Sequence, residues 1–105
     1  MNFLLEGKRI ASGRTVPGKT NWQVYDPNGI DLDVDTSAGR LTGTPIYITS
    51  IGGDGRHWST TGDTSIYNPT ATSFRVYVRN SDGNPLTPAQ ANNWKWHINW
   101  IGVEV

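Results

Sequence analysis

The last twelve residues of the chain, 94–105, constrain the fold more than any other segment. Trp94, Trp96, Ile98 and Trp100 fall on one side of a period-2 pattern, and the residues between them are polar. Because successive side chains of a strand project to opposite faces, this alternation predicts a half-buried β-strand at the C-terminal end.

The apolar side of this pattern changes after Trp100, because Ile101 and Val103 continue it on the other face. Two structures are consistent with the change: a bulge that shifts the register, or a strand that protein covers on both faces. We favour the second, with a neighbouring subunit over the outer face. The sequence therefore predicts a homo-oligomer in which Trp100 lies at the interface.

Composition limits the classes of protein to which the chain can belong. Its 105 residues fit one domain, 1–105. Lys and Arg balance Asp and Glu at nine each, so the electrostatic signature of a nucleic-acid partner is absent. No apolar run approaches the length of a membrane span. The five Trp and four Tyr favour sheets and turns.

The first residues, 1–8, have no basic region and only a three-residue apolar run, FLL, so they do not resemble a signal peptide. We therefore expect a cytoplasmic, non-classically released or virion-associated protein.

Short alternating runs recur along the chain at the spacing of an antiparallel β-sandwich. They predict an all-β fold of six to eight strands, which include the segments 6–15, 21–25, 30–36, 43–51, 65–67 and 74–80. One short helix is expected at 87–91, where Thr87 and Gln90 form a capping-box pattern and Pro88 suits the first helical position.

Two charged stripes stand out on the predicted strands: Asp31, Asp33 and Asp35 on one, and Arg75, Tyr77 and Arg79 on another. The acidic stripe lacks the glycine and glutamate of an EF-hand loop, and nothing apolar is placed to raise a carboxyl pKa for catalysis. A solvated face is the simple interpretation of both. The sharper hypothesis is that they meet across a homo-oligomer interface, since Arg and Tyr are favoured there.

The polar loop 52–63 carries the pair His57 and Trp58. No helix start and no Gly-Lys-Ser/Thr follows, so phosphate binding is not indicated. An indole can stack on the C–H face of a sugar while polar side chains bind its hydroxyls, which favours carbohydrate binding. The alternative is that Trp58 packs under its own loop. The two histidines, 57 and 97, show no metal-ligand spacing, so neither a metal nor a cofactor is predicted.

The order of five short motifs resembles the H-type lectin family. The matching segments are Arg9–Gly13, Asn21–Asp26, Pro45–Ile51, Ala71–Val78 and Ile98–Glu104. The resemblance implies a six-stranded antiparallel β-sandwich that forms trimers, in some cases doubled to hexamers, with sugar sites near the subunit boundaries. The acidic loop, arginine and Trp-His pair of the family have no counterparts at 16–20, 60–61 and 81–82.

We therefore expect any sugar site to use this chain's own loops, with Trp58 or Trp94 as the stacking platform. The hydroxyl-binding candidates are His57, Arg79, Asp82 and Asn84. The leading functional prediction is a carbohydrate-binding module, a lectin without catalysis, that acts through multivalency. The alternative is a structural or receptor-binding tip domain of a phage tail fibre or spike.

Overall fold

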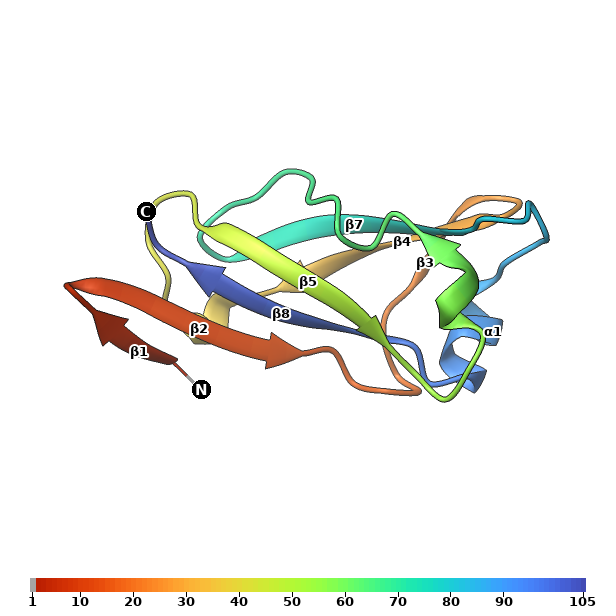
Figure 1. Ribbon diagram of the computed structural model, residues 1–105, viewed down its shortest axis with the longest axis horizontal. Coiled ribbons are helices and arrows are strands. Elements are labelled where there is room, and N and C mark those ends of the chain that lie inside the picture. Colours follow the sequence, from red (N-terminus) through yellow and green to blue (C-terminus); the bar gives the residue numbers. More distant parts are fainter. Residues whose placement is uncertain (1) are drawn as a thin grey trace.

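The computed structural model describes residues 2–105, and its strands form two antiparallel sheets (Figure 1). Sheet A contains, in spatial order, β1 (Asn2–Leu5), β2 (Lys8–Arg14), β8 (His97–Val103) and β5 (Ile46–Gly52). Sheet B contains β3 (Gln23–Asp26), β4 (Gly29–Asp35), β7 (Ser73–Asn80) and β6 (Thr60–Thr61). The all-β, antiparallel prediction is confirmed.

In the described part of the chain, three short helices connect the strands. They are the 3₁₀ helices η1 (Ser37–Gly39) and η2 (His57–Ser59) and the α-helix α1 (Pro88–Asn93). The predicted capping box is present in α1: Gln90 N–H donates to Thr87 Oγ1 at 3.1 Å, and Thr87 N–H donates to Gln90 Oε1 at 3.0 Å.

The inward faces of both sheets share one hydrophobic core. The alternation on β4 and β7 places Ile30, Leu32 and Val34 opposite Val78, Val76 and Phe74 in register, each at most 2% exposed. Tyr47 of sheet A contacts Phe74 of sheet B, with ring centroids 4.6 Å apart. These contacts between the two layers bury the apolar residues of four strands against one another.

The C-terminal strand is shorter than predicted, because β8 begins at His97. Trp94 instead caps the end of α1, and Lys95 turns the chain with a positive φ of 58°. Trp96, Ile98 and Trp100 are buried at 0%, 0% and 6% exposure. Trp100, expected at a subunit interface, therefore packs in the core of its own chain, because it shares the inward face with Trp96 and Ile98.

The switch of apolar face after Trp100 does not arise from a bulge. β8 pairs in unbroken register with β2 and β5, so Ile101 projects outward and is 45% exposed. Gly102 takes the inward position, where an added Cβ would lie 2.9 Å from Tyr47 Cε1. The strand therefore has a buried inner face and an outer face on which Ile101 is open to solvent beside the polar Asn99.

The strands β1 and β6 were not predicted, and the predicted strand 65–67 does not form in the described structure. β1 pairs with β2 through a tight turn at Glu6 and Gly7, both with positive φ. β6 is only two residues long, and segment 65–67 contributes a single bridge, Tyr67 with Arg75. Figure 1 shows α1, η2 and the turn after β7 gathered at one end of the molecule, opposite the C-terminus.

Candidate functional site

The end of the molecule that carries α1 and η2 contains a cleft of about 940 Å³. We call it the end cleft. Three segments line it, namely the loop with η2, the turn after β7, and the helix α1. Its lining residues are Arg56, Trp58, Ser59, Asn80, Ser81, Asp82, Asn84, Pro85, Gln90 and Trp94.

Trp58 is the most exposed large apolar side chain of those described, with 88% of its surface accessible. The 3₁₀ turn that presents it is held from both sides: Ser59 Oγ donates to Arg56 O at 3.1 Å, and Thr60 Oγ1 donates to His57 O at 2.6 Å. The alternative in which Trp58 packs under its own loop is therefore not what the structure shows. A fixed turn holds an open indole at the edge of the cleft.

Trp94 forms part of the cleft wall and is half-buried. Its ring lies 5.3 Å from the ring of Trp96, and the Arg56 guanidinium carbon is 5.4 Å from its centroid. Both contacts are typical of stabilising aromatic and cation–π geometry. Trp94 is thus largely occupied by its neighbours, and Trp58 is the better platform for a ligand.

The turn after β7 supplies the polar wall. Asn84 donates to Asp82 through its backbone N–H at 2.9 Å and its side-chain amide at 3.0 Å. Ser81 joins this turn to the Trp58 loop, because its N–H and its hydroxyl both donate to Ser59 O, at 2.9 and 2.6 Å. Asn80 closes the turn by donating to Asn84 O and Pro85 O. The exposed Asp82 carboxylate can accept further hydrogen bonds, as sugar hydroxyls require.

The structure brings together four of the six sugar-site residues expected from the sequence: Trp58, Asp82, Asn84 and Trp94. His57 and Arg79 lie elsewhere. His57 points inward, where its Nδ1 is buried without a hydrogen-bond partner close to Gly53. Arg79 projects from the outer face of sheet B and lines a different hollow. The neighbouring residues Arg56 and Gln90 were missed, although Arg56 lies in the loop 52–63 and Gln90 in the predicted helix 87–91.

The outer face of sheet A carries three exposed isoleucines, Ile46, Ile48 and Ile101, which we call the isoleucine face. Ile48 and Ile101 are direct partners across β5 and β8. Ile48 on the edge strand β5 is 60% exposed, and Ile101 on the central strand β8 is 45% exposed. Two paired aliphatic side chains are thus open to solvent.

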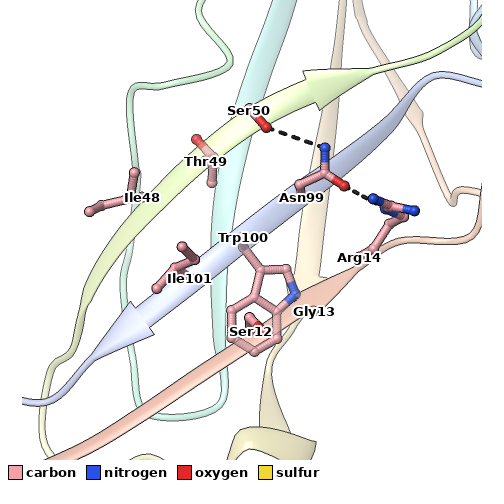
Figure 2. A pocket seen from close by; sticks show the side chains of 9 residues that line it. All are labelled: Ser12, Gly13, Arg14, Ile48, Thr49, Ser50, Asn99, Trp100 and Ile101. Carbon is pink, nitrogen blue, oxygen red and sulfur yellow. Dashed lines mark hydrogen bonds between the residues drawn. The ribbon is translucent and has the colours of Figure 1, made fainter. Parts of the chain in front are cut away.

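A shallow hollow adjoins this face, and Figure 2 shows how its side chains lie. Arg14 Nε donates to Asn99 Oδ1 at 2.6 Å, and Asn99 Nδ2 donates to Ser50 Oγ at 3.2 Å, so one row of polar residues is internally paired beside the isoleucines (Figure 2). Trp100 reaches the hollow next to Gly13, which has no side chain to cover it.

The charged stripes lie side by side on adjacent strands of one chain. β4 and β7 pair so that Asp33 faces Arg75 and Asp31 faces Tyr77, while Asp35 faces Ser73. Arg75 forms an ion pair with Asp33 at 2.8 Å. Its hydrogen bonds lower the pKa of the Asp33 carboxyl, and hydrogen bonding by Ser37 lowers that of Asp35. Arg75 and Asp33 therefore already satisfy each other within one chain, and the hypothesis that the stripes meet across a homo-oligomer interface stays a prediction.

The described residues contain no cluster of three His, Asp or Glu side chains placed to hold a metal ion. In the same range, none of the helices has the length and hydropathy needed to cross a membrane. Comparison of the chain with protein-family models, curated proteins and solved structures finds no significant match.

Proposed function

We propose that the protein is a carbohydrate-binding module without catalytic activity, and that the end cleft is its sugar site. The observation that carries the proposal is the open Trp58 indole, held by a hydrogen-bonded turn and facing a polar wall. An exposed aromatic ring beside a few fixed polar groups suits a sugar, which has both an apolar C–H face and hydroxyls.

The polar groups of the cleft match this class of ligand better than an anionic one. Arg56 is positioned over Trp94, and Asp82 offers a carboxylate on the facing wall. Charges of both signs therefore line the cleft. Neutral hydroxylated ligands can use both, whereas a phosphate would be repelled by Asp82.

We further propose that the module acts as a homo-oligomer assembled through the isoleucine face. Burying an isoleucine contributes roughly 1.5–3 kcal/mol relative to leaving it exposed, so three together favour association with a second copy. The resemblance to the H-type lectins motivates a trimeric β-sandwich, in which six of the strands, β2, β3, β4, β5, β7 and β8, supply the expected set. Several weak sugar sites in one assembly gain avidity.

A glycan array with the labelled wild-type protein and the variant Trp58→Ala tests the sugar site. We expect sugar-inhibitable binding by the wild type and a loss of about tenfold or more in affinity for the variant. Val24→Ala is the matched control, because it also removes an exposed apolar side chain but lies on β3, outside the cleft lining. Absence of binding to every glycan, or equal binding by Trp58→Ala and wild type, would contradict the proposal.

The second candidate function is an assembly or adhesion module, such as a fibre tip, and the isoleucine face favours it independently of sugar. Sedimentation velocity combined with the glycan array separates the two functions. A protein that forms the oligomer but leaves the glycan array empty supports the assembly module alone.

A further inference from the structure

The outer face of sheet B holds a second hollow that the end cleft does not include. Its volume is about 380 Å³, and three tyrosines from separate segments form its walls: Tyr25 on β3, Tyr77 on β7 and Tyr67 in the loop before β7. We call it the tyrosine groove. Its other lining residues are Asp26, Gly29, Ile30, Thr61, Gly62, Ser65, Val78 and Arg79.

The three rings form a continuous aromatic row. The Tyr25 and Tyr77 centroids lie 4.8 Å apart, and those of Tyr67 and Tyr77 lie 4.9 Å apart, both with edge-to-face geometry. Tyr25 is 61% exposed and Tyr67 is 48% exposed. Edge-to-face packing fixes the rings against one another while their outer surfaces remain in solvent, which pre-organises an aromatic surface.

Two glycines, Gly29 and Gly62, line the groove beside the tyrosines. Gly29 is the direct partner of Arg79 on the neighbouring strand, and it presents no side chain there. Gly62 has a φ of 103° and lies so close to the backbone of Tyr77 that an added Cβ would come within 2.5 Å of Tyr77 O. Gly62 therefore lets its loop pack directly against β7, which fixes the backbone beside Tyr77.

The tyrosine groove and the end cleft adjoin along β6 and β7. Thr60 pairs with Asn80 and Thr61 pairs with Arg79. Asn80 lines the cleft, whereas Thr61 and Arg79 line the groove. Tyr77 is three residues from Asn80 on an extended strand, a span of roughly 10 Å. One extended ligand can therefore contact both hollows.

We infer that the ligand is an oligosaccharide of neutral sugars that runs from Trp58 in the end cleft, past Arg79, to the tyrosine groove. This inference rests on the proposed function and specifies its ligand class: an extended chain and not a single sugar. Each aromatic surface stacks on one sugar ring, and Arg79, Asp26 and Asp82 bind hydroxyls along the way. Arg79 and Asp26 line the groove together, so charges of both signs face the ligand there as they do in the end cleft, and a neutral sugar can use both.

Titration calorimetry with linear series of glucose, galactose, mannose and N-acetylglucosamine, from monosaccharide to hexasaccharide, tests the inference. For the series that binds, wild-type affinity is expected to increase about tenfold or more with chain length. Tyr25→Ala removes this increase and leaves the affinity for the shortest bound sugar unchanged. Arg79→Gln, a second variant on a different strand, has the same effect. Trp58→Ala weakens binding of every length.

The outcomes separate the two proposals. If Tyr25→Ala and Arg79→Gln retain the full increase with length while Trp58→Ala loses binding, the sugar site stands and the extended ligand is overturned. If no series binds the wild type although the glycan array shows sugar-inhibitable binding, the sugar site stands and the extended neutral ligand is overturned. If the array is empty as well, the proposed function itself fails. A Tyr25→Ala variant that changes only the sedimentation coefficient would show a protein interface at this face and would also overturn the inference.

Discussion

Arg75 and Asp33 form a two-point ion pair between the neighbouring strands β7 and β4 of one chain. Arg75 Nε donates to Asp33 Oδ1 at 2.8 Å and Nη2 donates to Oδ2 at 2.9 Å. The pair lowers the pKa of Asp33 and raises that of Arg75. Asp33 is 67% exposed and Arg75 is 34% exposed. The pair therefore makes only a small contribution to the free energy of unfolding, and salt screens it.

The first prediction concerns the pH dependence of this pair. Because the folded-state pKa of Asp33 is lowered, its stabilisation is present above the unfolded-state pKa of about 4 and is lost as the pH falls through the lower folded value. Asp33→Asn should therefore be slightly less stable than wild type in urea at neutral pH and equally stable in strong acid. Asp54→Asn, in the loop before η2, is the control. A difference that persists unchanged in acid would contradict the assignment.

A second prediction tests the fit between β2 and the tryptophan of β8. An added Cβ at Gly13 would lie 2.6 Å from Trp100 Cζ2, so Gly13→Ala should lower the free energy of unfolding by about 1–3 kcal/mol. Gly55→Ala is the matched control, because its Cβ meets nothing within 4 Å. Denaturant unfolding of both variants measures the difference. Equal stability of the two would show that Trp100 does not pack against Gly13.

A third prediction links the core to the end cleft. The buried Trp96 indole donates from Nε1 to Gly55 O at 2.8 Å and so fixes the loop that carries Trp58. Trp96→Phe should cost about 1–3 kcal/mol of stability, since Gly55 O loses its donor, and should also weaken sugar binding. Trp58→Phe, at an exposed position, should change stability by no more than about 0.5 kcal/mol. Unaltered sugar affinity in folded Trp96→Phe would contradict the link.

A fourth prediction addresses the isoleucine face. Ile48→Lys places a charge opposite Ile101 and should raise the dissociation constant of the oligomer about tenfold or more, or roughly 1.4 kcal/mol. Val24→Lys also replaces an exposed apolar residue but lies on sheet B, so it should leave assembly unchanged. Sedimentation velocity over a concentration series measures both. A wild type that stays monomeric throughout would exclude this face as an interface.

The long strands of the fold could be predicted because their signal is local. Alternation of Phe74, Val76 and Val78 alone defines an inward face, and the structure buries all three. The strands β1 and β6 could not be predicted in the same way. β6 is only two residues long, and its strand character depends on pairing with β7, whereas β1 depends on a turn at Glu6 and Gly7.

The candidate site was predictable in its loops and in four of its side chains, Trp58, Asp82, Asn84 and Trp94. Sequence reasoning chose the loop around Trp58 together with Asp82 and Asn84, and the structure joins these two segments through Ser81 and Ser59. It could not find that the left-handed conformation of Arg56 turns His57 inward and Trp58 outward. The alternation on 74–80 does predict that Arg79 projects outward. It could not show that Arg79 lines a hollow other than the end cleft, because that depends on how the loops pack around β7.

The most direct test follows the indole N–H signals of the five tryptophans by NMR while the oligosaccharide selected on the array is added. Trp58→Phe assigns the decisive signal. The proposed site predicts a large shift for the Trp58 indole and a smaller one for Trp94, while the buried indoles of Trp22, Trp96 and Trp100 stay in place. A bound sugar that leaves the Trp58 signal unmoved would contradict a sugar site in the end cleft.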